Sequence, residues 1–313
     1  MKRVRALLLA AVPVLVTASV YLLAPEDAGA EGAGPDLSAA YRSQAAQDAK
    51  GAEGAKAWAE RSEGAGSAEV QEALAGLPAG LDAPAEKELA QQLVASAENS
   101  TLDWRSAYSY IEDIDDGQGY TAGIIGFCTG TNDLLTLVKG YTKAHPDNGL
   151  ATYLPALRAV DGTDSHEGLD PGFTAAWKAE AEVPAFRKAQ DTARDRVYFA
   201  PAVRLAKLDG LGTLGQFVYY DAMVFHGPGT SPTGFYGLRA RALEKSDSPT
   251  EGGSEKAYLD TFLDLREDAM RTRDPDIDTT RVDTAQRRFL DEGNLDLRTP
   301  LEWQVYGETY KVP

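Results

Sequence analysis

The stretch LGTLGQFVYYDAMVFHGPG, residues 211–229, is apolar on almost every side of a helical projection. A helix without a polar face has no side to turn toward water, so it belongs in a protein interior. We therefore predict a buried helix that ends at Gly227 and Pro228. One residue conflicts with that setting, because Asp221 lies in the middle of the apolar run.

A buried carboxylate without a partner costs several kcal/mol, so Asp221 requires a nearby cation. The candidates are Arg266 in LDLRED and Arg281 in TTRVDT. From the residues alone, a purely structural ion pair explains this pattern as well as a functional one does.

Helical periodicity continues on both sides of this stretch, with Asp82 as the candidate N-cap of the first helix. The predicted helices cover residues 82–99, 103–114, 132–145, 187–209 with an interruption at Pro201, 254–273 and 284–294. The segment GYTAGIIGF, residues 119–127, carries glycines and β-forming residues and predicts a hairpin. The predicted fold class is mainly α, with one small β element.

The N-terminus has the features of an export signal. Basic residues precede an apolar run from Ala6 to Ala24, which predicts a secretory signal peptide over residues 1–30. We expect cleavage and secretion, and the alternative is an uncleaved anchor on the outer face of the membrane. Residues 31–80 are rich in Ala, Gly and Glu and predict a largely disordered linker. Residues 81–313 are then the folded domain.

The chain is strongly acidic, with a formal net charge of −17. Such a protein does not bind nucleic acid through its phosphates, whereas it attracts a polycation over long distances. The simpler interpretation is that the acidity only keeps the protein soluble.

Cysteine and histidine usage argues against disulfide and metal chemistry. Cys128 is the single cysteine, so no internal disulfide forms and we expect a small buried hydrophobic side chain. The histidines His145, His166 and His226 lack the spacing of metal ligands. We therefore predict no metal and no cofactor.

Residues 112–120, EDIDDGQGY, place four carboxylates within five positions. Like charges this close repel one another and cost stability, which a cation or a cationic substrate would offset. Within this cluster Asp116 precedes Gly117, and we expect its side chain to stay hydrated and ionised in a turn. A plain Asp-Gly turn is the simpler interpretation.

Glu98 lies at the C-terminal end of a predicted helix. The negative end of the helix dipole and partial burial against Trp104 disfavour its ionised form, as a general acid requires. The alternative is an ordinary hydrated residue at a helix end. A protonated Glu98 with an ionised Asp116 is the acid/base pattern of glycoside hydrolysis. In that pattern Thr121 is placed to orient a water molecule.

Four segments together resemble a bacterial chitosanase of glycoside hydrolase family 46. They read SAENSTLDWRSAYSYIEDIDDGQGYTAGIIGFCTGTNDLL, RDRVYF, LGQFVYYDAMVFHGPG and TTRVDTAQRRFLDEGNLDL. The resemblance runs in order over residues 81–313 and includes none of residues 1–80. It implies a mainly α, two-lobed, lysozyme-like fold, with a small sheet in one lobe and the active-site cleft between the lobes.

The resemblance also implies the reaction, which is inverting endo-hydrolysis of β-1,4-linked glucosamine in chitosan. By their matching positions, Glu98 is the general acid, Asp116 is the general base and Thr121 helps to hold the attacking water. Asp133 matches a residue that binds a protonated amine of the substrate. Gln118 departs from the family pattern, because a basic residue is expected there.

Further positions carry supporting roles under the same resemblance. The substrate-binding candidates are Ser100, Glu112 and His226, and His226 has the alternative of a helix cap. Asp221, Arg266 and Arg281 are implied to form one network that supports the general acid.

The expected partner is therefore chitosan, and we expect a monomer without nucleic-acid partners and without a membrane partner apart from the alternative anchor. Carboxylates along a groove would pair with successive ammonium groups of the polymer, each exposed pair contributing roughly 0–1 kcal/mol. Two other functions remain open. One is a peptidoglycan-cleaving lysozyme-like enzyme, and the other is a non-catalytic polysaccharide-binding surface protein.

Overall fold

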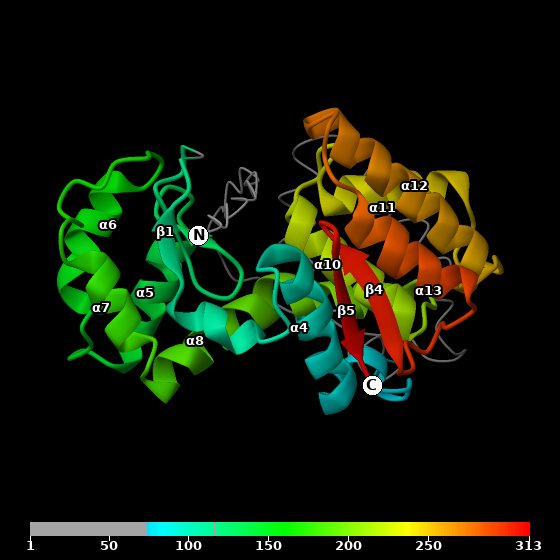
Figure 1. Ribbon diagram of the computed structural model, residues 1–313, viewed down its shortest axis with the longest axis horizontal. Helices are drawn as coiled ribbons and strands as arrows, with labels where there is room; N and C mark the ends of the chain where they lie inside the picture. The colour runs from blue at the N-terminus through cyan, green and yellow to red at the C-terminus, as the bar shows by residue number, and fades with distance from the viewer. Residues whose placement is uncertain (1–73, 116) are drawn as a thin grey trace, which may run out of the picture. The chain divides into compact units, whose positions relative to one another are not determined.

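The computed structural model describes residues 74–115 and 117–313, and it divides them into two compact units (Figure 1). The first unit comprises Glu98–Arg196, and the second comprises residues 74–97 together with Val197–Pro313. The predicted signal peptide and residues 31–73 of the predicted linker lie outside the described residues. Within the described ranges, no helix combines the length and the apolar character needed to cross a membrane.

The first unit joins a three-stranded antiparallel sheet to a group of helices. Its strands are β1 (Ile111–Asp113), β2 (Tyr120–Ala122) and β3 (Phe127–Cys128), in the spatial order β1-β2-β3. Its helices are η2 (Trp104–Ser109), α5 (Asp133–Ala144), η3 (Ala151–Tyr153), α6 (Leu154–Val160), α7 (Phe173–Glu180) and α8 (Pro184–Arg194). The predicted hairpin over residues 119–127 and the predicted helix over residues 132–145 are both confirmed.

Aromatic residues form the core of the first unit. The buried ring of Trp177 lies edge-on to Phe186, with ring centroids 5.0 Å apart. Its indole Nε1 donates a hydrogen bond of 3.1 Å to the carbonyl oxygen of Tyr108, and Gln190 Nε2 donates another of 3.1 Å to the same oxygen. These bonds attach helices α7 and α8 to the chain segment that leads into β1.

The second unit is built around α10 (Thr213–His226), which is buried along nearly its whole length, as the opening sequence stretch predicts. The other elements of this unit are η1 (Gly80–Asp82), α4 (Pro84–Glu98), α9 (Ala200–Leu208), α11 (Phe235–Lys245), η5 (Pro249–Glu251), α12 (Glu255–Arg273), η6 (Arg281–Arg287), α13 (Arg288–Asp291), β4 (Leu301–Val305) and β5 (Glu308–Val312). Helix α4 ends on Glu98, where the first unit begins. Helices α9, α11 and α12 pack against α10.

The predicted helix over residues 187–209 is interrupted as expected, but not by a simple break. A π-helical segment, η4 (Asp195–Phe199), lies between α8 and α9. Pro201, which has no backbone N–H to donate, lies in the first turn of α9 directly after this segment.

Two predictions were wrong. Residues 103–114 do not form one helix, because a 3-10 helix ends at Ser109 and strand β1 follows, with Ile111 buried and Glu112 exposed in the alternation of a strand. Asp82 is not the N-cap of α4, since it closes the preceding 3-10 turn and its carboxylate pairs with Lys207 Nζ at 2.7 Å.

The hairpin formed by β4 and β5 was not predicted from the sequence. Its signals are the alternating buried residues Leu301, Trp303 and Val305 and a two-residue turn. Tyr306 and Gly307 in that turn both have positive φ, at 52° and 81°, the conformation of a type I′ hairpin turn.

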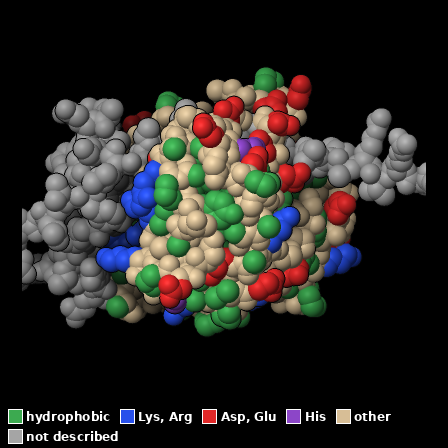
Figure 2. Space-filling model, turned by 90° about the vertical axis from the view of Figure 1, so that its left-hand side faces the viewer, with side chains coloured by type: hydrophobic (Ala, Val, Ile, Leu, Met, Phe, Trp, Pro, Cys, Tyr) green, Lys and Arg blue, Asp and Glu red, His purple; other side chains and the backbone are tan. Residues whose placement is uncertain are grey.

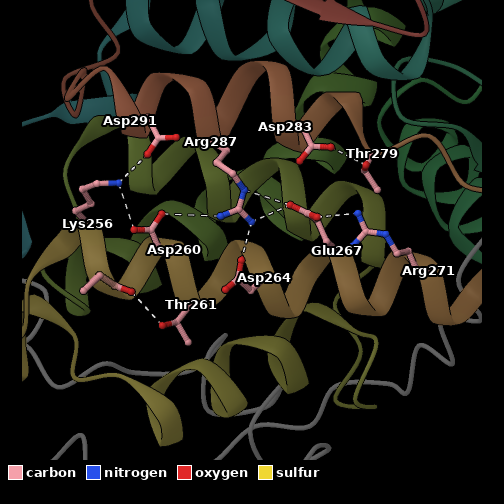
Figure 3. Close-up of polar contacts among 11 residues, drawn as sticks. Lys256, Asp260, Thr261, Asp264, Glu267, Arg271, Thr279, Asp283, Arg287 and Asp291 are labelled. Atoms are coloured by element: carbon pink, nitrogen blue, oxygen red, sulfur yellow. Dashed lines mark hydrogen bonds and ion pairs between the residues drawn. The ribbon is translucent and has the colours of Figure 1, made fainter.

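The outward face of α12 carries an ion-pair network with η6 and α13 (Figure 3). Arg287 Nη2 lies 2.8 Å from Glu267 and 2.9 Å from Asp264, and Lys256 Nζ lies 2.9 Å from Asp291. Figure 2 views the side of Figure 1 that carries α6 and α7, and acidic side chains are spread over that face among neutral and apolar ones. The acidic composition is thus not gathered into one patch on that face.

Candidate active site

Three predicted or neighbouring site residues form one row across the sheet of the first unit. Glu112 on β1 is opposite Thr121 on β2, and Thr121 is opposite Cys128 on β3. Directly opposed residues of antiparallel strands project from the same face, so the three side chains share one side of the sheet. Glu112 is exposed, whereas Thr121 and Cys128 are buried.

The Thr121 hydroxyl is held by the thiol of Cys128. Its Oγ1 atom lies 3.4 Å from Cys128 Sγ, and Sγ donates a hydrogen bond of 3.3 Å to the carbonyl oxygen of Gly126. With the thiol proton used in that bond, the sulfur accepts from the Thr121 hydroxyl. The lone pairs of Oγ1 are then directed away from the sulfur and can accept a hydrogen bond. Cys128 is buried, as predicted, and it also makes polar contacts.

Asp133, the first residue of α5, is locked by three neutral donors that share one carboxylate oxygen. Its Oδ1 accepts hydrogen bonds from the Cys128 backbone N–H at 2.9 Å, the Thr131 hydroxyl at 2.7 Å and the Leu134 N–H at 2.7 Å. Burial raises the pKa of Asp133 to about 6, and these donors oppose that rise only in part. The other oxygen, Oδ2, remains available to hold a cation.

The remaining predicted residues of the first unit lie near the end of α4. Glu98 is half-buried as the last residue of that helix, and Ser100 is exposed just beyond it with a positive φ of 51°. The proposed neighbour of Glu98, Trp104, is buried. Asp116 lies outside the described residues, so its predicted role as the base stays a prediction.

The buried carboxylate of α10 has the cations that the sequence requires. Asp221 lies 2.7 Å from Arg266 Nη2 and 2.7 Å from Arg281 Nη2, and all three side chains are at most 3% exposed. Burial alone would raise the pKa of Asp221, but the guanidinium groups of Arg281 and Arg266 hold it well below its ordinary value. The predicted ion pairs are therefore present, while their support of the general acid stays a prediction.

A fourth member of this network was missed. Gln286 donates a hydrogen bond from Nε2 to Asp221 at 2.7 Å and accepts one from Arg266 Nη1 at 2.7 Å. The sequence feature that could have indicated Gln286 is its position about one turn after Arg281, on the same face of the π-helical segment η6.

His226 is the last residue of α10 and is 1% exposed. Its ring lies edge-on to Phe225, with centroids 4.8 Å apart. Burial and the nearby positive charge of Arg266, Arg273 and Arg281 lower its pKa well below the ordinary value, so the imidazole is neutral. Its contact with substrate stays a prediction.

The parts of the chain that the structure describes contain no group of three or more His, Cys, Asp or Glu side chains placed to bind a metal ion. The site as built therefore offers carboxyl, hydroxyl and amide groups, which can transfer protons and hold a cationic ligand.

Comparisons with known proteins agree with this chemistry. The model of the family described as glycosyl hydrolase family 46 matches residues 92–301. A chitosanase of Streptomyces sp. (strain N174) is 57% identical over 234 residues, which are 75% of this chain and 84% of the relative. A chitosanase of Nocardioides sp. (strain N106) is 54% identical over 233 residues, which are 74% of this chain and 84% of the relative.

Among solved structures, the co-crystal structure of chitosanase OU01 with substrate superposes with a TM-score of 0.73 at 52% identity. The match covers 76% of this chain and 100% of that one. The mainly α, lysozyme-like fold class predicted from the sequence is confirmed by this likeness. The chain belongs to glycosyl hydrolase family 46 and is a glycoside hydrolase.

Proposed function

We propose that this protein is a secreted chitosanase that hydrolyses β-1,4 bonds between glucosamine units inside the chitosan chain. The observation that carries the proposal is the 57% identity over 234 residues to a protein named chitosanase. A structural neighbour named as a chitosanase co-crystallised with its substrate supports it. Secretion rests on the sequence of residues 1–30.

The chemistry that we propose is a single displacement with inversion. Glu98 gives its proton to the glycosidic oxygen as the bond to the anomeric carbon breaks. Water attacks that carbon from the opposite face, and Asp116 takes the proton that the water loses. The products are two shorter chains, and Glu98 and Asp116 exchange the proton through solvent before the next turnover.

In this proposal Thr121 orients the attacking water. If its hydroxyl proton is directed at Cys128 Sγ, its oxygen accepts one hydrogen of that water. The second hydrogen of the water is then directed to Asp116, and a lone pair is left for the sugar.

Substrate binding in this proposal depends on negative charge without a counter-ion. Oδ2 of Asp133, which the three donors on Oδ1 leave open, would hold an ammonium group of the polymer. Glu112, exposed on strand β1, and Ser100 would line the path of the chain. The network of Asp221, Arg266 and Arg281 would support Glu98.

The decisive experiment is the Glu98→Gln variant assayed for release of reducing ends from chitosan. Loss of the transferable proton should lower kcat by about two to four orders of magnitude with KM largely kept, the usual contribution of a general acid. Glu86→Gln, a half-buried carboxyl in the first turn of the same helix, is the matched control. Near-normal turnover of Glu98→Gln would refute the assignment.

The same assay separates the other two functions. Hydrolysis of peptidoglycan in preference to chitosan would indicate the lysozyme-like alternative. Binding of chitosan without release of reducing ends would indicate a binding protein.

A further inference from the structure

A cluster in the first unit has no part in the mechanism above. It consists of Asp113, Tyr120, His166 and Asp170, and it lies around the turn end of the hairpin formed by β1 and β2. His166 lies in the loop between α6 and α7 and was set aside in the sequence analysis as a scattered histidine. The structure brings it to the strand pair that flanks Asp116 in the sequence.

Asp113 and Tyr120 are the last register pair of that hairpin before its turn, of which the structure describes residues 114, 115 and 117–119. The His166 ring stacks on Tyr120, with centroids 3.9 Å apart and planes within 9°. Its Nε2 contacts Asp113 Oδ2 at 3.1 Å, an ion-pair distance without hydrogen-bond geometry. One side chain therefore contacts both strands at the point where the turn begins and ends.

The carboxylate of Asp113 extends this contact into the turn. Its Oδ1 accepts a hydrogen bond of 2.8 Å from the backbone N–H of Asp115, the residue next to Asp116. Its two oxygens thus connect the backbone of the turn to His166. Both carboxylate oxygens of Asp113 therefore contact other residues of the protein, so its role is more than that of a negative charge facing a substrate.

The loop that carries His166 is itself fixed. Asp170 accepts a hydrogen bond of 2.6 Å from the Tyr120 hydroxyl, and its carboxylate lies 3.8 Å from His166 Nδ1. Burial raises the pKa of Tyr120 to about 12, so its hydroxyl remains a donor. On the far side of the turn, Gly130 accepts a bond from Gly162 N–H at 3.1 Å and donates one of 2.9 Å to the Gln118 carbonyl oxygen.

We infer that His166 is a positioning residue that acts through Asp113 to hold the chain next to Asp116, the proposed catalytic base. This inference rests on the proposed role of Asp116. The His166 ring fixes the Tyr120 end of the turn, and its Nε2 fixes the Asp113 end. A misplacement of about 1 Å at a reacting group costs up to a hundredfold in rate, so loss of the clamp should lower kcat rather than weaken binding.

The test compares His166→Phe, which keeps a ring against Tyr120, with His166→Gln, which keeps an N–H group near Asp113. We expect His166→Phe to lower kcat on chitosan about ten- to a hundredfold, with KM within about twofold. His166→Gln should recover part of that loss. His145→Phe is the matched control, since His145 is an exposed histidine beside Tyr141, at 4.9 Å between ring centroids, and it should retain wild-type kcat.

A double-mutant cycle with Asp113→Asn then distinguishes positioning from general stability. If His166 acts through Asp113, the double variant should be no slower than the slower single variant. Rate losses that multiply, or a wild-type kcat in His166→Phe, would overturn the inference. If His166→Phe does not fold, His166→Gln and Asp113→Asn complete a cycle of their own.

Hydrogen exchange provides a reading that does not depend on activity. Amides of residues 114–119 should exchange faster in His166→Phe than in wild type, and His145→Phe should leave them unchanged. Equal exchange in all three proteins would overturn the clamp. If wild type released no reducing ends from chitosan, the proposed function would fail while this exchange comparison still tested the clamp.

Discussion

Asp221 in the second unit is buried and Asp133 in the first is partly buried, yet their pKa values move in opposite directions. Asp221 faces two guanidinium groups, and its pKa lies well below the ordinary value. Asp133 faces two backbone N–H groups and a hydroxyl, and its pKa rises to about 6.

The difference shows what each carboxylate can do. Burial penalises the ionised form in both, but only full positive charges outweigh that penalty. Asp221 is therefore ionised at every working pH and already neutralised by its partners. Asp133 is ionised only above about pH 6, and no cation in the described residues accompanies it. The first arrangement suits a structural support, and the second suits a site for a cationic ligand.

The largest expected effect follows from removing the carboxylate of Asp221, which is paired with Arg266 and Arg281 in the second unit. Asp221→Ala would leave Arg266 and Arg281 buried beside each other without a counter-ion. We expect a loss of about 3–5 kcal/mol in the free energy of unfolding. The corresponding fall in Tm is roughly 6–20 °C, which calorimetry would measure.

The control for this variant replaces the three charged members of the network with apolar residues of similar size. Asp221→Leu combined with Arg266→Met and Arg281→Met should be less destabilised than Asp221→Ala, because no buried charge is left unpaired. Since the folded-state pKa of Asp221 is depressed, its contribution is present above its ordinary pKa and disappears as the pH falls below that value. A loss under about 1 kcal/mol in Asp221→Ala would contradict this account.

The sequence was informative where a residue can be accommodated in a folded protein in only a few ways. A helix that is apolar on every side must be buried, and a carboxylate within it requires a cation. The residues alone gave Arg266 and Arg281 only as candidates, which the family resemblance placed in one network with Asp221. Strand β1 was missed because Ile-Glu-Asp is too short to display a period of two. The clamp of His166 on Asp113 could not be predicted, because it depends on a loop between α6 and α7 returning to the hairpin.

Asp133 illustrates the same limit at the site. Its position was predicted from the family resemblance, but its raised pKa arises from the burial that folding imposes, opposed in part by donors that folding brings to one oxygen. Thr131 is close in sequence, whereas the N–H of Cys128 is directed at Asp133 only because strand β3 ends there. Proton affinity at such a residue is a property of tertiary structure.

A smaller effect, on binding, is expected from the Asp133→Asn variant. At about pH 6, where Asp133 is half ionised and the glucosamine amines carry protons, KM for chitosan should rise about threefold to tenfold with kcat little changed. At lower pH the wild-type carboxyl is protonated too, so the KM values of wild type and variant should converge. Michaelis constants measured at several pH values would check this.

The contribution of Asp133 to the free energy of unfolding should depend on pH in the direction opposite to that of Asp221. Because the pKa of Asp133 is raised on folding, its favourable contribution is complete below the unfolded value of 3.8 and is lost as the pH rises through about 6. In Asp133→Asn, the free energy of unfolding should therefore vary less with pH between 3.8 and about 6 than it does in wild type. A KM difference that persists undiminished at acidic pH would show that the charge of Asp133 is not what binds the polymer.

The smallest effect is expected at Lys256 on the outer face of α12, where the ion pairs are solvated (Figure 3). Lys256, which is 49% exposed, pairs with Asp260 at 3.2 Å and with Asp291 at 2.9 Å. Exposed pairs contribute little and are screened by salt, so Lys256→Ala should cost only about 0.2–1 kcal/mol. Denaturant unfolding at low and high salt would test this, and the difference from wild type should shrink at high salt. A loss as large as that of Asp221→Ala would mean that pairing, rather than burial, sets the cost of removing a charge in this protein.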